Sequence, residues 1–142
     1  MAQINPYLNF PGNAEEAFNF YKSIFGGDFP MIMRFGDTPE AGTVAEDDKN
    51  KLMHIALPIG GNVLMASDAV GDMCTELKAG NNISLSVSAD SKDDADRIFN
   101  ALAAGGTIKM PMDNTFWGSY FGMVDDKFGV QWMVSYDEKY AG

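Results

Sequence analysis

The stretch "AEEAFNFYKSIFGG", Ala14–Gly27, decides the fold because a similar stretch occurs a second time in the chain. Its apolar residues recur every three or four positions, which is the pattern of an amphipathic helix with one face on a core. The second stretch, "SKDDADRIFNALAAGG" (Ser91–Gly106), has the same acidic start, amphipathic run and terminal glycine pair. We therefore predict two related helices and an internal repeat that extends around them.

Both helices begin with a capping signal. Asn13 is followed three residues later by Glu16, which is the spacing of a capping box, and Ser91 with Asp94 forms a weaker version. In a capping box, the two side chains accept hydrogen bonds from backbone N–H groups that the helix itself leaves free. We expect the first helix to have the stronger cap.

Strand-like segments surround each helix. The segments "INPYLNF" (Ile4–Phe10) and "NISLSVSA" (Asn82–Ala89) precede the two helices, and in both of them apolar and polar residues alternate. This is the period of a strand with one face on a core, so Ile4 and Ile83 should be buried. Three further strand-like runs follow each helix: residues 29–35, 51–59 and 62–67 in the first half, and residues 107–112, 119–124 and 130–135 in the second.

The repeat predicts an α+β fold built from two βαβββ modules within a single domain that spans residues 1–142. Module one covers residues 3–68, residues 69–81 form a linker, and module two covers residues 82–136. A chain of 142 residues has the length of one typical domain, and 46% apolar residues are enough for a substantial core.

The composition narrows the classes of partner. Twenty acidic and ten basic residues give a net charge of −10, which repels phosphate groups, so we predict neither nucleic-acid nor membrane binding. No segment approaches the roughly 18 apolar residues of a membrane-spanning helix, and the first residues do not have the pattern of a signal peptide. Cys74 is the only cysteine, which excludes an internal disulfide and favours a reducing, cytoplasmic setting.

The doubled βαβββ pattern resembles the vicinal oxygen chelate superfamily, which contains glyoxalase I, bleomycin-resistance proteins and extradiol dioxygenases. The segments "PYLNFPGNAEEAFNFYKSIFGG", "MHIALPIGGNVLMASD" and "DNTFWGSYFGMVDDKFGVQWMV" are similar to its PhnB-like branch, and the similarity extends from Ile4 to Ser135. The resemblance implies a curved mixed sheet that encloses a cavity, with the helices outside. It also implies a homodimer.

Glyoxalase-type members of the superfamily hold a divalent metal ion with four side chains, and the resemblance places these positions near Asn5, Met65, Asn82 and Met133. Strand alternation independently puts Asn5 and Asn82 on the face opposite the core. Two amides and two thioethers carry no charge, whereas hard divalent ions prefer carboxylates or imidazole, and thioethers suit Cu(I). These four positions therefore do not support a glyoxalase-type divalent metal site; a divalent metal held by other residues stays possible, and the cofactor stays unassigned.

His54 is the only histidine and the main catalytic candidate. In "KLMHIALPI" it alternates with Leu52 and Ala56, while the opposite face of the run is more apolar, so His54 should face the cavity. An imidazole there can act as a general acid or base, or as a single metal ligand. The alternative is a structural histidine that hydrogen-bonds a neighbouring strand, and the sequence leaves both open.

The predicted cavity combines polar groups with an adaptable apolar wall, as concave ligand sites usually do. The residues expected to bind the ligand are Asn5, Tyr7, Asn9, Met65, Asn82, Ser84, Trp117, Phe121 and Met133. Thioether side chains adapt to varied shapes, which suits binding rather than strict selection. Trp132 alternates with Met133 and should therefore face the core on the helix side.

Two functions follow from these residues. The first is a protein that binds, or binds and transforms, a small organic molecule in a concave cavity, as the resemblance implies. The net charge and the aromatic residues favour a cationic or aromatic compound. The alternative is a metal-dependent lyase or isomerase that uses non-standard ligands around His54, with Asp68 as one candidate. The sequence leaves open whether the protein is an enzyme.

Overall fold

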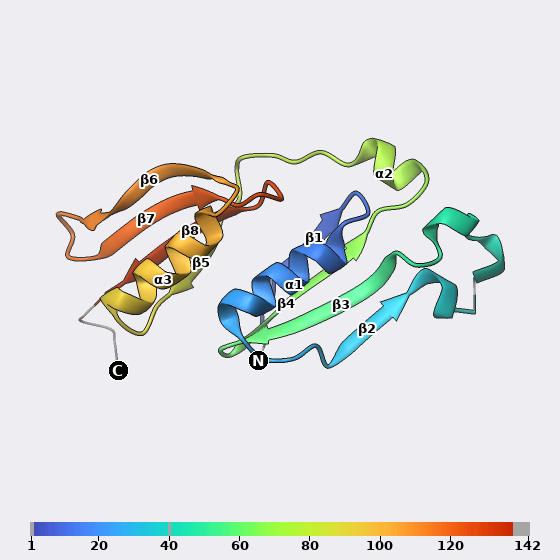
Figure 1. Cartoon of the computed structure of the whole chain (residues 1–142), viewed down its shortest axis with the longest axis horizontal. Helices are drawn as coiled ribbons and strands as arrows, with labels where there is room; N and C mark the ends of the chain where they lie inside the picture. Colours follow the sequence, from blue (N-terminus) through green and yellow to red (C-terminus); the bar gives the residue numbers. More distant parts are fainter. Residues whose placement is uncertain (1, 40, 138–142) are drawn as a thin grey trace. The chain divides into compact units, whose positions relative to one another are not determined.

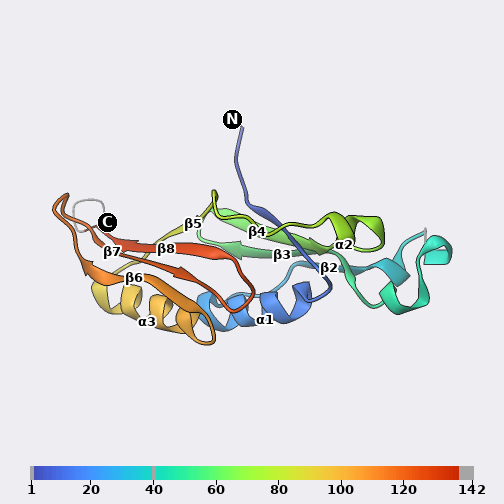
Figure 2. The ribbon, with the colours of Figure 1, turned by 90° about the horizontal axis from the view of Figure 1, so that it is seen from above.

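The computed structural model describes residues 2–39 and 41–137. The chain divides into two compact units, one that ends at Lys78 and one that begins at Ala79. Each unit contains a four-stranded sheet with one long helix along one face, as Figures 1 and 2 show. The predicted α+β class and the two βαβββ repeats are confirmed, whereas their union in a single domain stays a prediction.

The first unit contains sheet A, in which the strands lie in the order β1-β4-β3-β2. Strand β1 (Tyr7–Phe10) runs parallel to β4 (Asn62–Asp68), and β3 (Leu52–Ile59) lies antiparallel between β4 and β2 (Met31–Arg34). Helix α1 (Ala14–Phe25) lies along one face. A parallel pair needs a crossover connection, and here α1, β2 and β3 together supply it.

The core of the first unit lies between α1 and sheet A. Phe18 and Tyr21 of the helix are completely buried, and so are Ile55 and Leu57 of β3. Gly26 ends the helix with φ 77°, a conformation that glycine adopts without strain. Between β2 and β3, the described residues form short 3₁₀ turns at Phe35–Asp37, Ala41–Thr43 and Glu46–Asp48.

The second unit repeats this arrangement in sheet B, with the order β5-β8-β7-β6. Strand β5 (Leu85–Ser88) runs parallel to β8 (Gln131–Tyr136), and β7 (Tyr120–Asp125) lies antiparallel between β8 and β6 (Thr107–Asn114). Helix α3 (Lys92–Ala103) lies along one face. The topology is therefore the same in both units.

The core of the second unit contains Phe99 and Leu102 of α3. Trp132 is buried on the helix side of β8, so its predicted orientation is confirmed. Its indole Nε1 donates to Asp126 Oδ2 at 2.9 Å. The other oxygen of Asp126 accepts from backbone N–H groups of the β7–β8 turn, which Gly129 completes with φ 86°. One buried carboxylate thus connects the turn to the core.

The two helix starts differ from the prediction. Ser91 Oγ accepts from the backbone N of Asp94 at 3.0 Å, so the cap expected to be weaker is formed. The side chain of Asn13 makes no capping hydrogen bond. Instead, Asp68 Oδ1 at the end of β4 accepts from the backbone N of Ala14 at 2.9 Å. The prediction was wrong at Asn13 because a distant carboxylate satisfies the first turn of α1.

The first strand of each unit is shorter than predicted. Before β1, Asn5 Oδ1 accepts from the backbone N of Val63 at 2.9 Å. Before β5, Gln131 Nε2 donates to the backbone O of Ile83 at 2.6 Å. In both places a side chain takes the position of a backbone hydrogen-bond partner, so the regular backbone pairing with the neighbouring strand begins only after this point. Ile4 and Ile83, predicted in the core, are consequently 93% and 73% exposed.

The linker contains a short helix that the sequence does not predict. Helix α2 (Asp72–Glu76) is one turn long, too short to show an apolar period. In residues 2–39 and 41–137, no helix is long and apolar enough to cross a membrane.

Candidate functional site

The candidate site lies on the open face of each sheet, which we define as the face opposite its long helix. In sheet A the register aligns Tyr7 with Met65 and Met65 with Ala56. Their neighbours on β3 and β4, Ile55 and Ala66, are completely buried toward α1. Because side chains alternate along a strand, Tyr7 and Met65 point to the open face.

His54 meets Tyr7 on this open face. The Tyr7 hydroxyl and His54 Nδ1 lie 3.2 Å apart, within hydrogen-bond distance, and the two rings lie 5.7 Å apart between centroids. Tyr7 is 46% exposed and His54 is partly exposed. Strand β4 lies between β1 and β3, so the contact crosses one strand. The sheet therefore brings together two predicted site residues that are 47 positions apart.

Further polar and thioether groups surround this pair. Ser67 Oγ donates to Asn9 Oδ1 at 3.4 Å, one step along the same face. Met33 is the register partner of His54, and Met31 is the partner of Ala56. Neither methionine was predicted in the site. The signal was present in the alternation of "FPMIMRF", but only the pairing of β2 with β3 shows which residues they face.

The open face of sheet B is apolar and aromatic. Met133 is aligned with Met123, and Met123 with Met110, so three thioethers follow one another across three strands. Trp117 is 56% exposed and packs edge-on against Phe121 at 6.0 Å between centroids. The predicted residues Met133, Phe121 and Trp117 thus belong to one unit, whereas the Tyr7–His54 pair belongs to the other.

Three predicted ligand-binding residues lie outside the strands. Asn82 is exposed and Ser84 is partly exposed, and both precede β5. Asn5 precedes β1 and uses its side-chain oxygen to accept from the Val63 backbone N. Their participation in the site stays a prediction.

A divalent-metal site has no support among the described side chains. In the described ranges, no group of three or more His, Cys, Asp or Glu residues could hold a metal ion. Asp68 is not available to His54, because its oxygens accept from the backbone N atoms of Ala14 at 2.9 Å and Leu52 at 2.8 Å. It is 3% exposed, and its register partner Phe10 is buried against the helix side.

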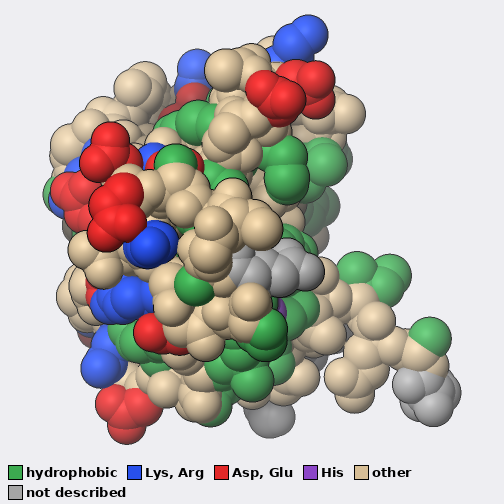
Figure 3. Space-filling model, turned by 90° about the vertical axis from the view of Figure 1, so that its right-hand side faces the viewer, with side chains coloured by type: hydrophobic (Ala, Val, Ile, Leu, Met, Phe, Trp, Pro, Cys, Tyr) green, Lys and Arg blue, Asp and Glu red, His purple; other side chains and the backbone are tan. Residues whose placement is uncertain are grey.

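Two of the shifted pKa values belong to contacts between a long helix and its sheet. Arg34 donates to both carboxylate oxygens of Glu15, at 3.0 and 2.7 Å, which lowers the pKa of Glu15. Asp96 accepts from the Tyr120 hydroxyl at 2.6 Å, which raises the pKa of that phenol. These contacts connect each helix to its sheet. On the side of the molecule that Figure 3 shows, acidic and basic side chains are interspersed on the surface.

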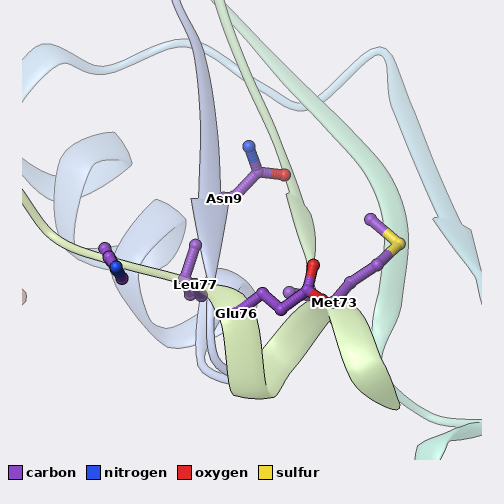
Figure 4. Close-up of a pocket in the computed structure, with 6 residues that line it drawn as sticks. Asn9, Met73, Glu76 and Leu77 are labelled. Atoms are coloured by element: carbon purple, nitrogen blue, oxygen red, sulfur yellow. The ribbon is translucent and has the colours of Figure 1, made fainter.

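A shallow cavity of about 450 Å³ lies beside the C-terminal part of β1. It is lined by Asn9, Ala69, Met73, Glu76, Leu77 and Lys78. Figure 4 shows Asn9 reaching from β1 and Met73, Glu76 and Leu77 coming from α2 and the residue after it. Because Asn9 also bonds Ser67, this cavity adjoins the open face of sheet A.

The fold and these residues can be compared with known proteins. A family model described as "3-demethylubiquinone-9 3-methyltransferase" matches residues 2–135. The chain belongs to this family. Protein YjdN of Escherichia coli K12 is 30% identical over 93% of both chains.

Solved structures agree with this family. The crystal structure of protein PA1353 from Pseudomonas aeruginosa is 43% identical, with a TM-score of 0.82 over 96% of this chain and 98% of that one. A Bacillus cereus protein described as a putative 3-demethylubiquinone-9 3-methyltransferase, PhnB protein, is 29% identical, with a TM-score of 0.77 over 95% and 99%. The predicted resemblance to the PhnB-like branch is confirmed.

The family shares its fold with the wider superfamily. A Burkholderia phytofirmans structure described as a glyoxalase/bleomycin resistance protein/dioxygenase family enzyme is 17% identical, with a TM-score of 0.61 over 92% of this chain and 95% of that one. At this identity the likeness concerns the fold alone. The site must therefore be argued from the residues of this chain.

Proposed function

We propose that the protein binds small organic molecules on the open faces of its sheets, and that on sheet A Tyr7 and His54 form the polar end of the site. The observation that carries the proposal is their contact at 3.2 Å on a partly exposed face. The neighbouring Met65 supplies an adaptable apolar wall. A few placed polar groups within apolar surroundings are typical of ligand sites.

The aromatic side chains of sheet B and the charge of the chain indicate the class of ligand. Trp117 and Phe121 offer aromatic faces, and the net charge of −10 attracts cations and repels anions. The family description names a demethylated ubiquinone, which is a quinone-type ring compound. We therefore infer that the ligand is aromatic, either neutral or cationic, and that quinones are one class to test.

Proton transfer within the bound molecule is the second candidate, and it would make the protein a lyase or isomerase. The contact between Tyr7 and His54 favours it, because imidazole and phenol both exchange protons. In an isomerisation, His54 Nε2 would take a proton from one atom of the ligand and return it to another, so that the imidazole ends neutral, while Tyr7 would hold the ring through Nδ1. A divalent ion is not needed for this step.

We also propose that the protein works as a cytoplasmic homodimer. The resemblance to a superfamily whose members are usually dimers favours the dimer, and the single Cys74 favours a reducing compartment. Light scattering of the purified protein would give the mass in solution, and a monomeric mass would contradict the dimer.

The binding proposal can be tested by thermal unfolding with a panel of aromatic, cationic and quinone compounds and S-adenosylmethionine, with and without divalent ions. We expect an aromatic compound to raise the melting temperature of the wild type, and Tyr7→Phe and His54→Ala to reduce this shift. Tyr120→Phe is the matched control, because it removes a phenol hydroxyl on the helix side. The proposal fails if no compound shifts the transition, or if both site variants respond like the wild type.

A further inference from the structure

Methionines surround a small residue on the open face of sheet A. Ala56 is aligned with Met65 on one side and with Met31 on the other. His54 lies two residues before Ala56 on the same strand and face, and Met33 is aligned with His54. Side chains aligned across two strands have Cβ atoms roughly 5 Å apart. Since Ala56 has no side chain beyond Cβ, long thioether side chains can reach over it toward each other and toward His54.

The contact with Tyr7 engages one ring nitrogen of His54 and leaves the other to be considered as a ligand. Its Nδ1 lies 3.2 Å from the Tyr7 hydroxyl, and the phenol oxygen can accept the proton of Nδ1. A metal-binding histidine usually donates its other ring N–H to an oxygen in this way, which fixes the ring and raises the basicity of the metal-binding nitrogen. Tyr7 can therefore hold His54 with Nε2 ready to bind.

The donor set selects the kind of ion. Hard divalent cations require carboxylate or carbonyl oxygens, whereas thioethers prefer soft ions such as Cu(I), and imidazole binds copper as well. No acidic side chain shares the rows formed by Tyr7, Met65, Ala56 and Met31 and by His54 and Met33. The overall charge of −10 favours cations in general.

We propose that the open face of sheet A binds a soft monovalent metal ion, Cu(I) or its analogue Ag(I), through His54 Nε2 and the thioethers of Met31, Met33 and Met65. This site lies within the first unit and does not require the organic ligand. Sheet B has three aligned methionines but no imidazole, so it should bind such an ion more weakly.

The experiment uses the full chain in a Cys74→Ser background, because a free thiol would itself bind a soft ion. Ag⁺ is titrated as nitrate in chloride-free buffer and followed by native mass spectrometry and calorimetry. We expect one tightly bound ion per chain. Since His54 is the only histidine, ¹⁵N spectra of its ring report one imidazole, and the Nε2 resonance should move while Nδ1 stays bonded to Tyr7.

Variants assign the ligands. His54→Ala and Met33→Leu should each weaken Ag⁺ binding at least about tenfold, and Tyr7→Phe, which removes the partner of the ring, by about tenfold. Leucine conserves the volume of methionine, so Met33→Leu should keep the fold. Met112→Leu is the matched control, because this thioether lies close to Gly122 on the helix side of sheet B, and it should leave binding unchanged.

Two results would overturn the proposal. One is tight Ag⁺ binding without any change in the His54 resonances. The other is loss of tight binding in Met110→Leu/Met123→Leu/Met133→Leu but not in Met33→Leu, which would place the ion on sheet B. Thermal shifts with organic compounds are measured in the presence of a thioether-competing chelator, so failure of metal binding and failure of ligand binding are seen separately.

Discussion

The open faces of the two sheets have the same layout but different chemistry. In sheet A, one row across the four strands contains Tyr7, Met65, Ala56 and Met31. In sheet B, the corresponding row contains Ser86, Met133, Met123 and Met110. His54 lies two residues before Ala56 on β3, and Phe121 lies at the equivalent place, two residues before Met123 on β7. The repeat therefore keeps methionines at matching positions, whereas the contact between Tyr7 and His54 occurs in one unit only.

The helix starts differ between the units in a second way. Helix α3 is capped locally by Ser91, whereas α1 is capped by Asp68, which is 54 residues from Ala14. The local cap contributes to the helix even when tertiary packing is weak. The distant cap connects β4, α1 and the start of β3, so it forms only when the whole unit folds. Two equivalent helices thus depend on tertiary structure to different degrees.

The largest effect is expected from removing the distant cap. Asp68→Ala leaves the backbone N–H groups of Ala14 and Leu52 buried without acceptors, so the free energy of unfolding should fall by about 3 kcal/mol. Urea unfolding followed by circular dichroism measures it. If Asp68→Ala lowers the free energy of unfolding by less than Ser91→Ala does, the distinction between the two caps is contradicted.

The difference between the two open faces can be tested by giving sheet A, at position 54, the residue type that sheet B has at the equivalent position 121. His54→Phe gives sheet A the aromatic residue that sheet B has in Phe121. It should weaken binding of the organic ligand at least about tenfold, because the contact with Tyr7 is lost, with little change in stability since His54 is partly exposed. Isothermal titration of the best compound from the panel measures this. Unchanged affinity would show that both faces bind through apolar contact alone.

Removing the local cap should have a smaller effect on stability. Ser91→Ala deletes the acceptor for the Asp94 backbone N, which should lower the free energy of unfolding by about 1 kcal/mol. Ser91→Asp keeps an acceptor at this position and serves as the control. If Ser91→Ala unfolds at the same urea concentration as the wild type, the serine does not cap the helix in solution.

The smallest effect concerns the ion pair between α1 and β2. Because Arg34 lowers the pKa of Glu15, the folded state favours the charged carboxylate. This contribution is present above the unfolded-state pKa, near 4.5, and is lost as the pH falls through the lower folded-state value. Both side chains are partly exposed, so Glu15→Gln should lower stability by less than about 0.5 kcal/mol at pH 7. At pH 3 the difference from the wild type should shrink, and a difference that grows on acidification would contradict the assignment.

Local patterns predicted most of the architecture because they depend on short-range chemistry. The periods of two and 3.6 residues were sufficient to locate both long helices and the strand-like runs. The same alternation correctly placed Trp132 toward the core and Met65 away from it. Turn chemistry was also local, as Gly129 and Asp126 show in the β7–β8 turn.

By itself, the sequence determined the α+β repeat and the faces of most strands, since both depend on residues close together in the chain. Only the tertiary structure decided that Asp68 caps α1, that Asn5 and Gln131 end their ladders, and that Tyr7 contacts His54. It also decided that Met31 and Met33 face Ala56 and His54. The physical reason is strand register: pairing joins residues tens of positions apart, and alternation along one strand carries no information about the residue that lies opposite on the next.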